Sequence, residues 1–132
     1  MAASFNSVIR NAYMDTITSQ AGPGAKLRVY NGTRPTTGGG ALSGNTLLAE
    51  IALNATAFAP ASVNGTITVN AAAGAATAAA TGTASWARIV KSDGTTWVMD
   101  LDVGTDITVS PTAIQSGAQV TLTSGSFAAG NA

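Results

Sequence analysis

The sequence predicts an all-β fold, an antiparallel β-sandwich, preceded by one N-terminal amphipathic helix. Apolar residues recur at helical spacing up to a Gly/Pro-rich stretch at residues 21–24, and at a spacing of two after it. Turn-forming residues then interrupt the chain at short intervals, which is typical of sandwiches and barrels. We therefore divide the chain into a helix and turn over residues 1–22 and one β-sandwich unit over residues 23–132.

The helix is predicted over residues 4–19, with Ser4 as its N-cap. Its apolar residues follow the i, i+3, i+4, i+7 spacing and form one stripe. Packing of this stripe against the core is the favoured interpretation, and contact with a partner protein is the alternative. The members of the stripe are Phe5, Val8, Ile9, Ala12, Tyr13, Thr16 and Ile17.

Seven strands are predicted in the rest of the chain from the alternation of apolar and polar residues. They cover residues 26–30, 47–53, 67–69, 85–91, 96–103, 107–109 and 119–127. Residues 92–95, with the sequence Ser-Asp-Gly-Thr, give the strongest hairpin signal. The alanine tract at residues 71–80 is predicted to be extended, because Gly74 interrupts it and strands flank it.

The fifth predicted strand places two sets of residues on opposite faces. Trp97, Met99, Leu101 and Val103 share one face, and Val98, Asp100 and Asp102 share the other.

The composition excludes several classes of function. Ala, Thr, Gly and Ser make up 72 of the 132 residues, and six basic residues balance six acidic ones. A neutral chain has no field to attract nucleic acid or an anionic membrane, so we expect neither as a partner. Because the chain contains no Cys and no His, it cannot form a disulfide, a Cys/His zinc site or a Ser-His-Asp triad. We expect a protein that is not an enzyme and has no cofactor.

Three acidic residues, Asp100, Asp102 and Asp106, form the densest charged cluster. They could converge on a hard cation such as calcium. Their spacing is not that of an EF-hand loop, so we favour a solvated strand face and expect no metal site.

Residues 31–45 form a long Gly/Thr/Pro-rich loop, and long loops in compact domains often make contacts. The loop lacks the Gly-Lys-Ser/Thr sequence of a phosphate-binding loop, but Arg34 within it could contact a partner. Trp86 and Trp97 flank the predicted hairpin and could form a sugar-stacking platform. More often, a tryptophan in a strand pair belongs to the core or to an interface.

Four segments of the chain together resemble a family of small tailed-bacteriophage virion proteins, some of which are capsid cement, or decoration, proteins. The segments are KLRVYNGTRP (residues 26–35), LLAEIAL (47–53), ATGTASWARIVKSDGTTWVMDLDVG (80–104) and SGAQVTLTSGSF (116–127). Their order along the chain is that of the family. Where many relatives have an aromatic residue after the tryptophan, this chain has Ala87.

The resemblance implies a jelly-roll type of sandwich and a structural role in the virion. A homo-oligomer, such as a dimer, would sit on the outer surface of the capsid and bridge major capsid protein subunits to stabilise the shell. The protein would be made in the host cytoplasm. The alternative is a receptor- or glycan-binding module of a phage tail or head fibre. Candidate partner contacts are Phe5, Ile9, Tyr13, Arg34, Trp86 and Trp97.

Overall fold

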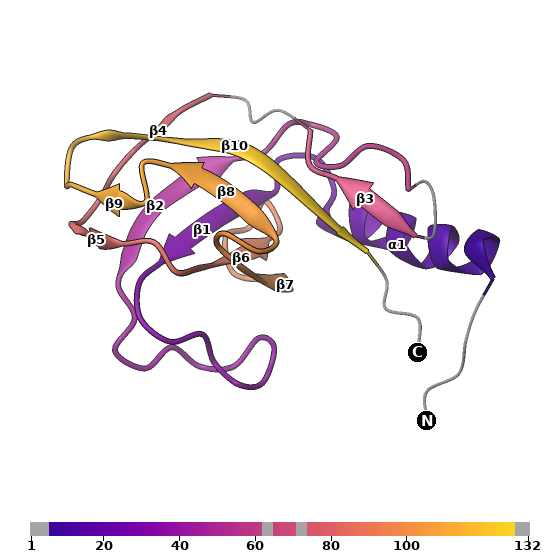
Figure 1. Cartoon of the computed structure of the whole chain (residues 1–132), viewed down its shortest axis with the longest axis horizontal. Helices are drawn as coiled ribbons and strands as arrows, with labels where there is room; N and C mark the ends of the chain where they lie inside the picture. The colour runs from indigo at the N-terminus through magenta and orange to yellow at the C-terminus, as the bar shows by residue number, and fades with distance from the viewer. Residues whose placement is uncertain (1–5, 62–64, 71–73, 129–132) are drawn as a thin grey trace.

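The computed structural model describes residues 6–61, 65–70 and 74–128. The protein is mostly β, with antiparallel sheets and one N-terminal helix, as the sequence predicts (Figure 1). All seven predicted strands are present. Three strands of two residues each, within the described part of the chain, were not predicted: β4 (Ala76–Thr77), β5 (Gly82–Thr83) and β9 (Ala113–Ile114).

The first sheet has four strands in the order β2-β1-β6-β7, and every neighbouring pair is antiparallel. Its strands are β1 (Lys26–Tyr30), β2 (Leu47–Ala52), β6 (Trp86–Val90) and β7 (Trp97–Asp102). The turn at residues 92–95 joins β6 to β7, as predicted, and Gly94 adopts a φ of 78° there.

The second sheet is built around β10 (Gln119–Ala128), the longest strand. β3 (Thr66–Thr68), β4 and β8 (Ile107–Ser110) all pair with it, each antiparallel. The described part of the alanine tract contains β4 and no helix, which agrees with the extended chain predicted for it. Residues 71–73 of the tract lie outside the described residues.

One hydrophobic core joins the two sheets and the helix, an arrangement compatible with a β-sandwich. The first sheet contributes Leu27, Val29, Ile51 and Ile89, and the second contributes Ile67, Ile107, Val109, Val120 and Leu122. Met14 and Ala21 of the helix are buried against the same core.

Helix α1 spans Ser7–Ala21. The side chain of Asn6 accepts a hydrogen bond of 3.0 Å from the backbone N–H of Ile9, and Gly22 ends the helix with a φ of 68°. The N-cap is therefore Asn6 and not Ser4, which lies outside the described residues. No helix in the described part of the chain is long and apolar enough to cross a membrane.

A β-bulge in β7 changes the predicted faces of that strand. Ile89 pairs with Met99, but Val90 pairs with Trp97, so Val98 is the extra residue. As a result, Trp97 shares a face with Asp100, which lies opposite Arg88. The prediction that Trp97 lies with Met99 and Leu101 was wrong, because the bulge interrupts the alternation.

Candidate interaction surfaces

Residues 31–45 contain no helix or strand, and hydrogen bonds of two asparagines close the base of this loop. The side chain of Asn31 accepts a hydrogen bond of 2.7 Å from the backbone N–H of Thr46. The side-chain amide of Asn45 donates to the carbonyl oxygens of Asn31 and Thr33, at 2.8 Å and 3.0 Å. The loop extends from the body of the protein between β1 and β2 (Figure 1).

The middle of the loop is attached to β6 and β7. The backbone N–H of Gly39 donates to Asp100 Oδ2 at 3.1 Å, and Arg88 Nη2 donates to the carbonyl of Gly40 at 3.0 Å. A Cβ atom on Gly38 or Gly39 would lie 2.8 Å from the ring of Trp97. The close approach of the loop backbone to this ring therefore requires glycine at both positions.

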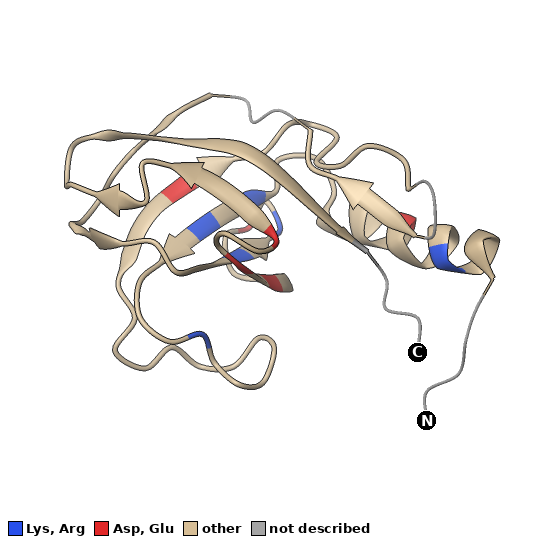
Figure 2. Ribbon diagram, viewed as in Figure 1, with Lys and Arg blue, Asp and Glu red and all other residues tan. Residues whose placement is uncertain are grey.

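Charged residues lie on neighbouring strands of the first sheet (Figure 2), and two of them, Arg88 and Asp100, bind the loop. Glu50, Arg28, Arg88 and Asp100 are in register on β2, β1, β6 and β7. Arg28 Nε lies 3.2 Å from Glu50 Oε2, and Arg88 Nε lies 2.7 Å from Asp100 Oδ1. The hydrogen bonding of the Arg88 guanidinium to the Asp100 carboxylate, which accepts, raises the pKa of Arg88 above its ordinary value. Opposite charges therefore neutralise one another within the sheet.

The three clustered aspartates have separate structural roles. Asp100 pairs with Arg88 and its side chain is 4% exposed, so the prediction of a solvated strand face was wrong for this residue. Asp102 pairs with Arg34 at 3.4 Å, and Asp106 Oδ2 accepts a hydrogen bond of 2.8 Å from the backbone N–H of Asp102. Among the residues that the structure describes, no group of acidic side chains is arranged to hold a metal ion.

The two tryptophans do not form one exposed platform. Trp86 is 1% exposed, stacks on Tyr30 at 4.7 Å between ring centroids, and donates its indole N–H to the carbonyl of Asn31. Trp97 is 46% exposed. Trp86 is thus a packing residue, as the favoured interpretation held, and only Trp97 can contact a partner directly. A sugar platform made by both rings is excluded by the burial of Trp86.

Helix α1 exposes most of its apolar stripe. Val8 is 73% exposed, Ile9 51% and Tyr13 68%. The helix packs through another face, because Asn11 Oδ1 accepts from the backbone N–H of Gly65 at 2.8 Å and Asp15 Oδ1 from that of Ala61 at 2.6 Å. The expectation that the stripe packs into the core was wrong for Val8, Ile9 and Tyr13, whereas Ile17 is partly buried against the core. Polar side chains orient this helix, and the periodicity of its apolar residues does not reveal them.

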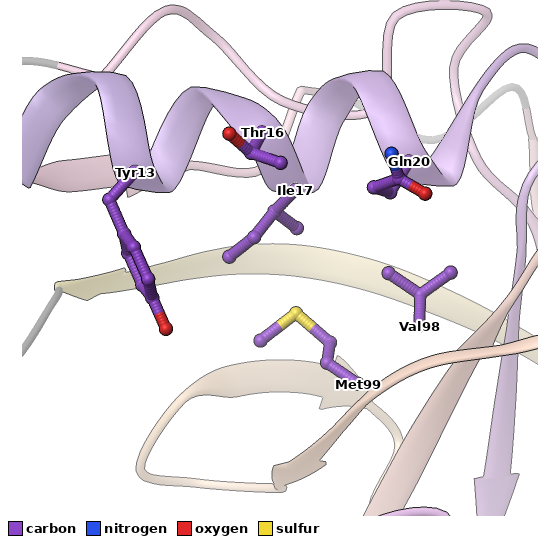
Figure 3. A pocket seen from close by; sticks show the side chains of 6 residues that line it. All are labelled: Tyr13, Thr16, Ile17, Gln20, Val98 and Met99. Carbon is purple, nitrogen blue, oxygen red and sulfur yellow. The ribbon is translucent and has the colours of Figure 1, made fainter.

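A groove of about 390 Å³ lies between α1 and the bulged part of β7. In Figure 3, Ile17 and Met99 point toward each other across the groove, Val98 lies below Gln20, and Tyr13 stands at one end. The residues that line the groove are Tyr13, Thr16, Ile17, Gln20, Val98 and Met99. None of them is charged.

Two surfaces follow from this geometry. The loop surface comprises residues 35–44 and Trp97, including Leu42, which is 43% exposed. The helix surface comprises the exposed stripe of α1 and the groove beside it. Neither surface contains a charged residue, and Arg34 lies at the rim of the loop surface, where it pairs with Asp102.

The predicted contact residues divide between these surfaces. Ile9 and Tyr13 lie on the helix surface, Trp97 on the loop surface and Phe5 outside the described residues. Four further residues of these surfaces were not predicted: Leu42, Gln20, Val98 and Met99. For Val98 and Met99 the only signal is the bulge, which becomes visible only when β7 is paired with β6.

Comparisons of the chain with protein-family models, curated proteins and solved structures found no match.

Proposed function

We propose that the protein is a structural component of a tailed-bacteriophage virion, a capsid cement or decoration protein of the jelly-roll type. In this proposal it binds the outer surface of the head as a homo-oligomer and bridges major capsid protein subunits. The observation that supports it most is the pair of uncharged, exposed surfaces on different elements of one β scaffold. A protein that links neighbouring molecules needs at least two contact surfaces, and the loop surface and the helix surface meet that need.

The arrangement of the segments that resemble the virion family also supports the proposal. The first of these segments leads into the loop, and the third contains β6 and β7, on which the loop lies. Gly39 and Asp100 join the loop to the third segment at 3.1 Å. The first and third of these segments therefore lie at or beside the loop surface, the part of the molecule to which we assign capsid contact.

The physical properties of the loop surface suit a lattice-binding protein. Its backbone is fixed by hydrogen bonds before any partner arrives, so binding costs less conformational entropy than the ordering of a free loop. With no charged side chain on the surface, affinity must come from contact area and from repetition over many capsid sites.

The test uses virus particles that lack the protein. Depleted particles should break at lower temperature, or under milder osmotic shock, than complete particles, and added protein should restore them. A Leu42→Asp variant should fail to bind and restore, because it places a charge on the loop surface. A Gln115→Asp variant is the matched control, since Gln115 is exposed in the turn between β9 and β10 and lies on neither surface.

A second candidate function is a glycan-binding module of a phage fibre. It is favoured by a pocket of about 250 Å³ beside the loop, where Arg34 and the half-exposed Trp97 lie together. Depleted particles that resist heat as well as complete ones, but fail to adsorb to cells, would replace the cement proposal with this one. Quenching of tryptophan fluorescence by a host glycan would then identify Trp97 as the contact.

A further inference from the structure

We propose that the helix surface binds a second copy of this chain, with the two α1 helices antiparallel about a two-fold axis. The proposed function supplies the expectation that the protein is a homo-oligomer, and this inference rests on it. What the inference adds is the surface through which the copies associate. Three features of the helix surface support it: the position of its charged residues, the spacing of its exposed residues and the shape of the groove.

The charged residues of α1 point away from the helix surface. The helix has two of them, Arg10 and Asp15, and both are partly buried against the segments that contain Gly65 and Ala61. Two identical copies can therefore bring their helix surfaces together without placing like charges opposite each other. A strongly acidic or basic partner would find no complementary charge on this surface.

Four of the exposed residues of α1 have the spacing of a helix-pairing seam. Ile9, Tyr13, Thr16 and Gln20 follow one another at intervals of four, three and four residues. This is the spacing with which one helix packs along another, and it forms a single line on the surface of α1. The midpoint of the line falls between Tyr13 and Thr16. In an antiparallel pair, Tyr13 of each copy therefore lies opposite Thr16 of the other.

The shape of the helix surface is complementary to itself under this arrangement. Ile9 is exposed near the start of the helix, whereas the groove lined by Ile17, Val98 and Met99 lies near its end. An antiparallel pair places the start of each helix opposite the end of the other. Ile9 of each copy is then positioned to enter the groove of its partner, so one patch supplies both the projecting and the receiving part of the contact.

The size of the surface sets the strength of the contact. A helix of 15 residues is about 22 Å long, and the stripe with its groove involves about ten residues of each copy. Stable interfaces use about 20–30 residues on each side, so this pair is a weak dimer in free solution. Copies that sit next to one another on a lattice would associate more completely, because their effective concentration is high.

The test is sedimentation of the full chain from about 1 µM to about 1 mM, a range that covers weak dissociation constants. The weight-average mass should rise toward that of a dimer. The Ile9→Lys variant should weaken association by about tenfold or more, because it places a charge in the contact. The Ser19→Lys variant adds the same charge at an exposed position of the helix outside the seam and should associate like the original chain.

A cross-linking experiment tests the antiparallel arrangement. The chain contains no cysteine, so each introduced cysteine reports one position. A mixture of the Tyr13→Cys and Thr16→Cys variants should form mixed disulfides faster than either variant forms disulfides alone. Faster disulfide formation within the Tyr13→Cys variant alone would overturn the antiparallel arrangement.

The inference would be overturned by a chain that stays monomeric at about 1 mM, the upper end of the concentration range above. Equal association of the Ile9→Lys and Ser19→Lys variants would also overturn it. So would binding of the helix surface to neutral lipid vesicles in place of a second copy of the chain. A dimer that forms as described but does not bind capsids would contradict the proposed function alone. A chain that binds capsids but remains monomeric on them would contradict this inference alone.

Discussion

Arg88 and Asp100 form a two-pronged ion pair beneath the loop surface, with Nε–Oδ1 and Nη2–Oδ2 distances of 2.7 Å and 3.1 Å. Their side chains are 13% and 4% exposed. Asp100 also accepts a hydrogen bond from the loop at Gly39, and Arg88 donates one to the loop at Gly40. The pair therefore connects β6, β7 and the loop, and the shape of the loop surface depends on it.

Replacing Asp100 by Asn should destabilise the fold by at most about 3–5 kcal/mol, because Arg88 would keep a largely buried charge without a charged partner. Urea unfolding would measure the loss. The Asp102→Asn variant is the control, since the Asp102 and Arg34 side chains are 45% and 40% exposed and such a pair contributes about 1 kcal/mol or less. Similar losses in the two variants would show that the buried pair has no special role.

Asp93 should make the hairpin turn sensitive to acid. The side-chain hydroxyl of Thr96, followed by the backbone N–H groups of Thr96 and Thr95, lowers the pKa of Asp93 to about 2. Because the folded-state pKa is below the ordinary value of 3.8, the charged form stabilises the fold above pH 3.8, and this stability is lost as the pH falls toward 2.

The Asp93→Asn variant should show a flatter dependence of the urea midpoint on pH in this range than the original chain. Added salt should reduce the difference between the two proteins, since Asp93 is fully exposed. Identical slopes at low salt would contradict the assignment.

Gly125 should not tolerate even one added methyl group. A Cβ atom there would lie 2.8 Å from Ile107 Cγ2 and 2.8 Å from Val69 Cγ2, both of which belong to branched side chains. Overpacking of this kind costs about 1–3 kcal/mol, so the Gly125→Ala variant should unfold at a lower urea concentration. The Gly74→Ala variant, which meets no atom within 4 Å, should be as stable as the original chain.

Gly39 should be essential for packing of the loop on Trp97. Gly39 and Gly44 both have a φ of 70°, but a Cβ atom on Gly39 would lie 2.8 Å from the Trp97 ring, whereas one on Gly44 would meet nothing. The Gly39→Ala variant should therefore expose Trp97 beyond its present 46% and shift the tryptophan emission to longer wavelength. The Gly44→Ala variant has the same backbone strain without the clash and should leave the emission unchanged.

Capsid binding, if the proposed function holds, should depend little on salt. The loop surface has no charged side chain, so few ions are released on binding. We expect the affinity to change by less than about tenfold between about 50 and 200 mM salt, a range over which a phosphate-binding protein loses about a thousandfold or more. A loss of that size would assign binding to Arg34 and the other charged residues instead.

The sequence predicts those features that depend on local signals. The hairpin of β6 and β7 follows from alternation on both sides of the Asp-Gly turn at residues 93–94, and the predicted strands match the pairing in the sheets. The bulge at Val98 could not be predicted. It coincides with packing of Trp97 against Gly38 and Gly39, which are far away in the sequence.

The candidate surfaces show the same division. Ile9 and Tyr13 were recognisable as apolar residues at helical spacing, but the spacing does not say which face of a helix is buried. In this protein Asn11 and Asp15 decide it, through backbone groups near residues 61 and 65. Contacts between polar side chains and distant backbone leave no periodic signal in a single sequence.

The central position of β10 has a consequence for the order of folding. β3, β4 and β8 each pair with β10 in the second sheet, and within the described part of the chain none of these three pairs with another of them. The first sheet needs only residues up to 102, whereas the second cannot assemble until residues 119–128 have left the ribosome. Until then, the three earlier strands present unpaired edges, which other chains can capture. When many copies are synthesised at once, a chaperone should therefore raise the yield of folded protein most if it acts before β10 has been synthesised.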